Sequence, residues 1–347
     1  MIWPWLVGGF FVSVFLCVLV RRLASTFAIV DEPRHPRKIH REPTPLLGGL
    51  GIYATVLIGI ILALVLTDTL TAGEVTVRHY VGFLLGGFVL MVGGALDDKV
   101  SLPPKYSVLF PLAASVLAIL GGIEVDKLTN PFGGVVELER WVSNGLVFVW
   151  LMAVMYTTKL LDGLDGLATS VSSVGVLAIL FLSATAAFFQ PDVTLFAAIG
   201  FGALLGFLVW NWHPASLFLG EGGSTFVGYL LGVLAVISGG KLAIALLVLG
   251  IPLLDLVWVA VRRLMSKQPL TVADRKHLHH RLLNVGWSQS AIVLSYVGLS
   301  ALFGLGALFL QSREKLFALL LLIVLMIVGA LLVVRKERCY GSPPSTS

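Results

Sequence analysis

The sequence predicts an all-α integral membrane protein, a polytopic bundle of about 11 transmembrane helices. Of its 347 residues, 57% are hydrophobic and only 12% are charged, whereas soluble domains carry about 25% charged residues. The apolar residues form long continuous runs that suit membrane-spanning helices of about 20 residues, and these runs lack the period-two alternation of a β-barrel. The basic residues are divided unequally between alternate loops, as they are in polytopic membrane proteins.

The predicted spans follow one another without a repeat at a fixed period, so we expect one membrane domain over residues 1–347. The first apolar run lacks both the basic start and the cleavage site of a signal peptide, and we expect it to be retained as a helix. Cys17 and Cys339 fit no metal or redox spacing, and we expect no disulfide. The predicted spans are 2–20, 47–67, 79–96, 106–122, 142–158, 167–189, 193–210, 225–240, 242–261, 288–309 and 316–334.

The basic residues also predict the orientation of the bundle. Lys and Arg mark cytoplasmic loops, so the side with most of them is assigned to the cytoplasm, and the net charge of +5 does not indicate nucleic-acid binding. The N-terminus is then outside, and residues 335–347 form a short cytoplasmic tail. The outer stretch 124–141 has an NPFGG centre that predicts a short hairpin. Of the 24 basic residues, those outside are Arg78, Lys127, Arg140, Lys241, Arg313 and Lys315.

Five polar segments fall on the predicted cytoplasmic side. Ionisable groups at helix ends in a membrane are costly, so they are candidates for a functional site. Because the segments come from five different loops, a helical bundle can bring them together. They are 31–49, 93–105, 157–168, 211–224 and 273–282.

Two pairs of aspartates stand out in these segments. Asp97 and Asp98 end the third span, and adjacent carboxylates repel each other unless a cation such as Mg²⁺ holds them. Asp162 and Asp165 in D-G-L-D-G-L are three residues apart, which puts both on one face of a helix. The alternatives are a solvated helix end for the first pair and a common Asp-Gly turn for the second.

The last two segments suggest anion binding. G-E-G-G-S at 220–224 opens the eighth span, and amides at a helix N-terminus bind phosphate readily; Ser224 could instead be only an N-cap. H-L-H-H-R at 277–281 suits a diphosphate, although a zinc site and a basic loop on anionic lipid are alternatives. Asp255 in the ninth span either pairs with a neighbouring helix or supports this basic loop, and both readings remain open.

Together, the five segments resemble the polyprenyl-phosphate N-acetylhexosamine-1-phosphate transferases, of the glycosyltransferase family 4 type, over residues 31–281. The paired aspartates of that family match Asp97 and Asp98, and its D-G-x-D-G-L motif matches from Asp162. Its N-x-x-P-A-x-x-F-x-G-D-x-G-S motif matches over 211–224, and H-x-H-H-R looks like the GlcNAc-type branch. With one-residue differences in spacing, its two early motifs match Pro33, Arg37, Lys38, His40, Pro45, Gly48 and Gly49.

This resemblance implies an enzyme of the cell membrane that starts the synthesis of a cell-envelope glycan. It would transfer a sugar-1-phosphate, GlcNAc-1-phosphate above all, from a UDP-sugar to undecaprenyl or another polyprenyl phosphate and release UMP on the cytoplasmic face. The implied cofactor is Mg²⁺, or Mn²⁺ in its place, and the implied partners are these substrates and membrane lipid, with a homodimer as a further expectation. The residues carried over are Asp97, Asp98 and Asp162 as catalytic; Asp98 and Glu221 as metal ligands; and Asp165, Asn211, His277, His279, His280, Arg281 and Lys159 as substrate-binding.

Three residues depart from the pattern of the family. Tyr156 and Lys159 replace two asparagines, and Glu221 replaces an aspartate. Lys159 lies one helical turn before Asp162, and we predict that Lys159 and Glu221 are one coupled change, in which the ammonium contacts Glu221 or the diphosphate. The alternatives are a catalytically degenerate relative and a membrane transporter, although a transporter predicts inverted repeats. A CDP-alcohol phosphotransferase is disfavoured because its D-G-x-x-A-R signature is absent.

Overall fold

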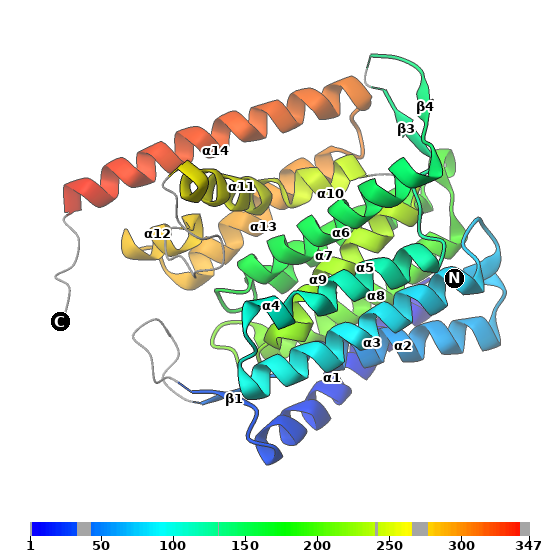
Figure 1. Ribbon diagram of the computed structural model, residues 1–347, viewed down its shortest axis with the longest axis horizontal. Helices are drawn as coiled ribbons and strands as arrows, with labels where there is room; N and C mark the ends of the chain where they lie inside the picture. Colours follow the sequence, from blue (N-terminus) through cyan, green and yellow to red (C-terminus); the bar gives the residue numbers. More distant parts are fainter. Residues whose placement is uncertain (1, 33–42, 131, 240–241, 266–276, 341–347) are drawn as a thin grey trace.

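The protein is a bundle of long helices with two short hairpins at its ends (Figure 1). The computed structural model describes residues 2–32, 43–130, 132–239, 242–265 and 277–340. The principal helices are α1 (Trp3–Thr26), α2 (Gly48–Leu66), α3 (Val77–Val100), α5 (Leu109–Leu120), α6 (Arg140–Leu161), α7 (Leu167–Ala184), α8 (Pro191–Asn211), α9 (Gly220–Ile237), α11 (Gly250–Met265), α13 (Gln289–Gly306) and α14 (Ser312–Tyr340). The short elements are β1 (Val30–Asp31), β2 (Thr44–Pro45), η1 (Thr69–Thr71), α4 (Pro104–Ser107), β3 (Lys127–Thr129), β4 (Val135–Glu137), η2 (Ala186–Phe188), α10 (Leu242–Val248) and α12 (Leu278–Asn284).

The helices have the length and surface of membrane-spanning helices. Within the described ranges, eight helices are long and apolar enough to cross a bilayer, or nine if the bent pair α10 and α11 counts as one span. Large apolar side chains such as Phe11, Phe15, Leu66 and Phe88 lie exposed on the outside of the bundle. Such a surface is unfavourable in water and expected in lipid. The predicted fold class, an all-α polytopic membrane protein, is confirmed.

All eleven predicted spans fall on helices, but at three of them the helix differs from the prediction in length or shape. Residues 106–122 form only a short apolar helix, and 316–334 lie inside the longer α14. Residues 242–261 form two helices that meet at 75°. Pro252 at the start of α11 has no N–H to donate to Val248, so the helix cannot continue unbroken. The number of membrane crossings therefore stays a prediction.

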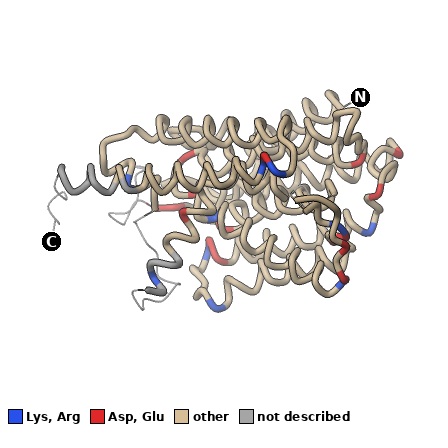
Figure 2. Tube along the Cα trace, turned by 90° about the horizontal axis from the view of Figure 1, so that it is seen from above, with Lys and Arg blue, Asp and Glu red and all other residues tan. Residues whose placement is uncertain are grey.

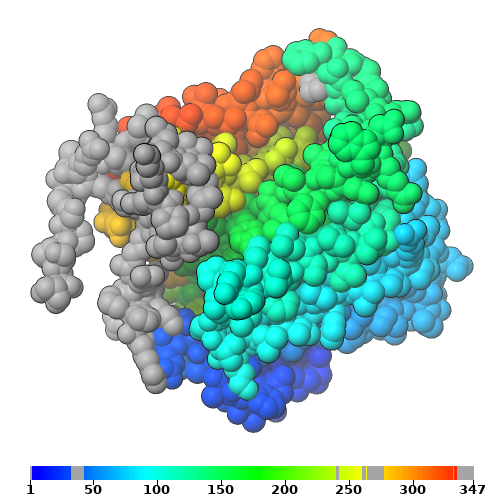
Figure 3. All heavy atoms as spheres, viewed as in Figure 1, coloured from blue at the N-terminus to red at the C-terminus, as the bar shows by residue number. Residues whose placement is uncertain are grey.

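Helix α9 lies at the centre of the bundle. Nearly all of its residues are buried, because α2, α3, α6 and α7 pack around it. Phe83 of α3 stacks on Tyr229 of α9 with ring centroids 5.3 Å apart, and it also meets Phe196 of α8 edge to face. Figure 3 shows α1, in blue, and α14, in orange, at opposite edges of this core. The position of α9 matters because its first turn carries the G-E-G-G-S motif.

The two ends of the bundle carry different features. The hairpin predicted within 124–141 is confirmed, since β3 pairs antiparallel with β4, and it lies at the end opposite β1, α4 and α12 (Figure 1). Charged residues gather in zones with long uncharged helix segments between them (Figure 2). The described parts of the five polar segments all lie toward the end with β1, α4 and α12. The sequence prediction that they converge is therefore confirmed for these parts.

Candidate active site

Glycines of three polar segments fit directly against one another and fix the start of α9. A side chain on Gly49 of α2 would collide with the backbone of Gly223, and one on Gly94 of α3 would collide with Gly222. The amides of Gly48 and Gly49 also donate to the carbonyls of Phe218 and Leu219, at 2.9 Å each. Helices in lipid approach closely where small residues meet. This packing holds Asp98 and Glu221 next to each other.

Asp98 lies against the first turn of α9. Its Oδ1 accepts a hydrogen bond of 3.0 Å from the backbone N–H of Glu221. A side chain on Gly220 would collide with the carboxylate of Asp98, and Gly220 also has a φ of +74°, which favours glycine. The N-terminus of α9 thus faces a carboxylate. A helix N-terminus carries a partial positive charge, which stabilises the negatively charged form of Asp98.

Asp97 points to the loop that follows α3. Its Oδ1 accepts from the N–H of Leu102 and its Oδ2 accepts from the hydroxyl of Ser107, both at 2.7 Å. These bonds close the turn between α3 and α4. Asp97 also lines a small pocket together with Lys159 and Glu221. Its structural role in the loop is visible, and a direct role in catalysis stays a prediction.

Lys159 and Glu221 form an ion pair across the site. Nζ of Lys159 lies 2.6 Å from Oε2 of Glu221, so the predicted contact between the two is confirmed. The ammonium also lies 6.0 Å from the ring centre of Tyr156, a distance at which a cation is attracted to an aromatic face. Three residues that depart from the family pattern therefore lie together between α6 and α9.

Asp162 ends α6 and faces the other acids. Its backbone N–H donates to the carbonyl of Thr158, which places it just beyond the last helical turn. Burial raises the pKa of Asp162 well above its usual value, and the nearby carboxylates of Glu221, Asp98 and Asp165 raise it further. Asp98, Asp162 and Glu221 thus form an acid cluster, in which a bound cation would relieve the repulsion between the carboxylates.

Asp165 and Asn211 hold the loop that leads into α9. Oδ2 of Asp165 accepts from the N–H of Ala215 at 3.1 Å and lies 2.7 Å from Nδ1 of His213. The buried Asn211 donates to the carbonyl of Leu217 and accepts from the hydroxyl of Thr169. Sequence reasoning assigned both residues to substrate binding, and the structure shows them supporting the loop; binding stays a prediction. The sequence analysis did not name His213 as a site residue, although it lies inside the polar segment 211–224.

The His-Arg segment is anchored by Asp255. Oδ2 of Asp255 lies 3.0 Å from Nδ1 of His277, and its carboxylate accepts from the N–H of Leu278 at the start of α12. Of the two open readings, support of the basic loop is therefore the one observed. His280 and Arg281 follow on the same short helix, so Asp255 positions the segment as a whole.

His279 is the member of this segment that reaches the D-G-L-D-G turn. Its Nε2 would meet a side chain on Gly163 at 2.8 Å, and its ring is only 1% exposed. Burial lowers the pKa of His279 well below its usual value, and the neighbouring imidazoles of His280 and His277 lower it further. Within the described residues its Nε2 has no hydrogen-bond partner. A buried polar atom without a partner is costly, so this nitrogen is suited to a ligand group.

The donor set fits a magnesium ion that arrives with a phosphate group. Mg²⁺ is commonly held by one or two carboxylates together with substrate phosphates and waters. Asp98 accepts from the backbone N–H of Glu221, and the two carboxylates are close enough to act on each other electrostatically. Nowhere in the described ranges do three acidic, histidine or cysteine side chains form a complete metal cage, and Glu221 is engaged by Lys159. These residues therefore fit a metal ion whose ligands come partly from the protein and partly from the phosphate groups of the substrate.

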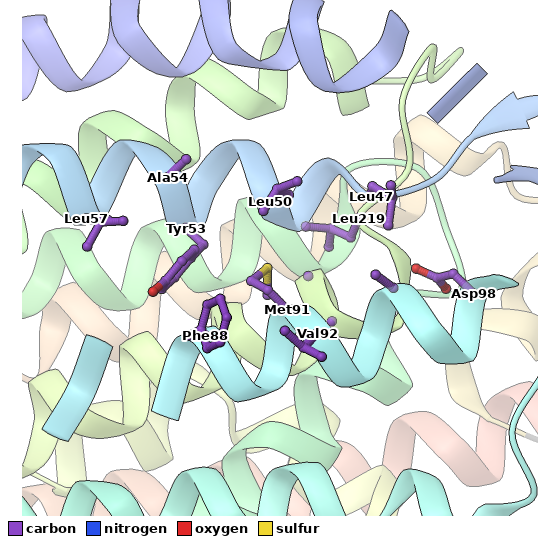
Figure 4. A pocket seen from close by; sticks show the side chains of 13 residues that line it. Leu47, Leu50, Tyr53, Ala54, Leu57, Phe88, Met91, Val92, Asp98 and Leu219 are labelled. Carbon is purple, nitrogen blue, oxygen red and sulfur yellow. The ribbon is translucent and has the colours of Figure 1, made fainter. Parts of the chain in front are cut away.

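An apolar groove opens beside the acid cluster. It has a volume of about 410 Å³ and runs between α2, α3 and the start of α9. Figure 4 shows Asp98 at one end and Leu57 and Phe88 toward the other. Pockets for ligands are mostly apolar with a few placed polar groups. A groove of this kind suits a hydrocarbon chain whose polar head lies at the acid cluster.

Four residues expected near the site, Pro33, Arg37, Lys38 and His40, lie outside the described residues. Pro45 is described, and its carbonyl accepts from the N–H of Phe218 at 2.9 Å. Ser224 is no N-cap: its hydroxyl donates to the carbonyl of Glu221 inside the first turn of α9. The early segment is therefore joined to the G-E-G-G-S segment through Pro45, Gly48 and Gly49.

Comparisons with known proteins agree with this arrangement. Residues 80–239 match the family described as glycosyl transferase family 4. The probable undecaprenyl-phosphate N-acetylglucosaminyl 1-phosphate transferase of Bacillus subtilis is 30% identical, over 89% of this chain and 85% of the relative. The decaprenyl-phosphate N-acetylglucosaminephosphotransferase of Mycobacterium tuberculosis is 29% identical, over 93% and 87%. The undecaprenyl-phosphate alpha-N-acetylglucosaminyl 1-phosphate transferase of Escherichia coli K12 is 26% identical, over 87% and 82%. With this match and this coverage, the chain belongs to glycosyl transferase family 4.

Proposed function

We propose that this chain transfers N-acetylglucosamine 1-phosphate from UDP-GlcNAc to a polyprenyl phosphate and releases UMP. The relatives that match most of the chain are named for this transfer. The observation that carries the proposal is the cluster of Asp98, Asp162 and Glu221 at the end of an apolar groove. Such a site can bring a charged diphosphate and the head of a lipid together.

The reaction requires positioning and charge neutralisation more than covalent help from the protein. An oxygen of the lipid phosphate attacks the β-phosphorus of the donor, the new O–P bond forms, and the bond to the α-phosphate breaks, so that UMP leaves. The second pKa of a phosphomonoester is about 6, so the attacking phosphate is largely deprotonated at neutral pH. A dedicated base is therefore not essential, and Asp97 can act by holding the loop over 101–107.

Different side chains of the site would bind the metal, the nucleotide and the phosphate groups. Asp98 and Glu221 would hold Mg²⁺, or Mn²⁺ in its place, which would neutralise charge that builds up on the diphosphate. Asp162 lies beside both and, with Asp165, would bind the nucleotide end. The buried Nε2 of His279 would take a hydrogen-bond partner from the substrate, and Arg281 would supply a charged donor to phosphate.

We further propose eleven crossings, an outer N-terminus and an active site on the cytoplasmic face of the cell membrane. The supporting observation is that the basic residues assigned outside, such as Arg78, Lys127 and Arg140, stand at the start of α3, in the hairpin and at the start of α6. The site lies at the other ends of α3 and α6. The positive-inside rule then directs the site end toward the cytoplasm.

One assay tests the function directly. The purified protein in detergent is given UDP-GlcNAc, UDP-GalNAc or UDP-glucose, with and without undecaprenyl phosphate and Mg²⁺, and UMP is measured. We expect UMP release from UDP-GlcNAc that depends on both the lipid and the metal. Absence of UMP with every donor, in protein that is folded by its melting curve, would instead indicate a catalytically degenerate relative.

A further inference from the structure

The ion pair between Lys159 and Glu221 engages a carboxylate that a divalent cation would also bind. The two side chains meet at 2.6 Å and are 30% and 38% exposed. The backbone of Glu221 is also held at the site, because its N–H donates to Asp98, so the residue keeps its place whichever cation its carboxylate binds. The ammonium and a divalent cation therefore compete for the same oxygens.

The surroundings of Lys159 favour a positive charge that can change partners. Asp97 lines the same small pocket as the ion pair, and Asp97 and Glu221 are both close enough to act on Lys159 electrostatically. A partly exposed ion pair contributes little to stability. The lysine side chain is flexible and carries three donors on a compact charge, so it can move to a nearby phosphate oxygen at small cost.

We propose that Lys159 is an exchangeable counter-ion that makes metal binding depend on the diphosphate of the donor. Without donor, Lys159 remains on Glu221 and the carboxylate is closed to the metal. When the diphosphate enters, Lys159 leaves Glu221 for a phosphate oxygen, and Glu221 becomes available to the metal. The metal alone would leave Lys159 without an anion, and the diphosphate alone would leave Glu221 without a cation. When both ligands bind, Lys159 contacts the phosphate and Glu221 contacts the metal, so every charge has a partner. This inference rests on the proposed function.

The exchange predicts a thermodynamic coupling between two ligands. A coupling of this kind is reciprocal, so the diphosphate must tighten the metal by the same factor as the metal tightens the diphosphate. The coupling is a property of binding and needs no turnover. It can therefore be measured with Mn²⁺, which is visible by electron paramagnetic resonance, and with UDP as the diphosphate.

The test compares Mn²⁺ binding to the intact protein in detergent, with and without saturating UDP. In the parent protein, UDP should tighten Mn²⁺ about tenfold, within the usual range of coupling between sites. In Lys159→Gln, Mn²⁺ alone should bind about fivefold more tightly than in the parent, and the effect of UDP should fall to about twofold or less. Lys159→Arg keeps the charge and should keep most of the coupling.

The matched control is Lys127→Gln, which removes the ammonium from an exposed ion pair with Glu137 at the opposite end of the bundle. It should leave Mn²⁺ binding and its dependence on UDP unchanged. The exchange is overturned if Lys159→Gln binds Mn²⁺ as the parent does with the coupling intact, or if UDP leaves Mn²⁺ binding to the parent unchanged. Either result is compatible with UMP release, and Mn²⁺ binding can be measured even if no UMP is released. The counter-ion role of Lys159 and the transferase function are therefore tested independently.

Discussion

Asp97 and Asp98 are neighbours in the sequence, yet they meet different partners. The carboxylate of Asp98 accepts from the N–H of Glu221 in the first turn of α9, whereas Asp97 accepts from Leu102 in the loop after α3 and from Ser107 at the end of α4. Successive side chains on a helix point in directions about 100° apart, so the pair cannot face one point equally. The sequence predicts that both acids belong to a functional site. Which partner each side chain meets depends on the neighbouring helices, which the sequence does not give.

The first residue-scale prediction distinguishes the acids by substitution. Asp98→Asn and Asp162→Asn should each reduce turnover about 100-fold or more, the scale of losing one electrostatic group of a preorganised site. Their melting temperatures should change little, because asparagine at position 98 keeps an oxygen that can accept from the Glu221 N–H, and the side chain of Asp162 supports no loop. Asp97→Asn should lower both turnover and melting temperature, because it weakens two hydrogen bonds that shape the loop.

Asp126→Asn serves as the control for these variants, because Asp126 is an exposed aspartate at the hairpin end. It should leave both UMP release and the melting curve unchanged. If Asp98→Asn and Asp162→Asn keep near-parent turnover, the assignment of these acids to the active site is wrong.

At the scale of helices, sequence patterns anticipate positions better than shapes. The long apolar runs locate every long helix, and the one-turn spacing of Lys159 from Asp162 anticipates the contact with Glu221. The bend between α10 and α11 was missed, because the prediction used hydropathy alone and hydropathy does not register the N–H that Pro252 lacks. Hydropathy also does not show which helices and loops lie next to each other in the bundle. The hydrogen bonds by which Asp165 and Asn211 support the loop before α9 could therefore not be predicted.

The crossing of α3 and α9 is the contact on which the site depends most. Gly94 meets the backbone of Gly222 here, and Asp98 follows Gly94 by one turn of the helix. Backbone atoms cannot rotate away as a side chain can. Any added atom at Gly94 must therefore move α3 away from α9 and carry Asp98 with it.

The element-scale prediction follows from this crossing. Gly94→Ala should destabilise the protein by about 1–3 kcal/mol, the usual cost of overpacking, and should also reduce UMP release. Gly145→Ala in α6 is the matched control, since its new side chain would meet nothing within 4 Å. The control should be neutral or stabilising by up to about 1 kcal/mol, because alanine favours a helix over glycine. Equal melting temperatures for the two variants would contradict the close crossing.

At the scale of the whole molecule, the protein has two distinct ends. One end holds the acid cluster, α4 and α12, and the other holds the hairpin of β3 and β4 (Figure 1). Helix α3 connects them, from Arg78 near its start to Asp98 near its end. Because α3 is long and apolar enough to cross the bilayer, these two ends must lie on opposite sides of the membrane if α3 spans it. The orientation of the site then follows from labelling either end.

The last prediction assigns each end to a side. In a background of Cys17→Ala and Cys339→Ser, single cysteines replace Lys99 at the site end and Lys127 in the hairpin, both exposed lysines. A maleimide that cannot cross membranes should label Lys127→Cys in intact cells and Lys99→Cys only after permeabilisation, because basic loops are retained in the cytoplasm. Each variant must still release UMP, which shows that the helices keep their arrangement. The reverse labelling would place the site outside, where a donor held in the cytoplasm cannot reach it through lipid, because its charged phosphates are costly to move across a membrane. That result would defeat the orientation and the proposed reaction together, whereas labelling of both positions in intact cells would show that α3 does not cross the bilayer.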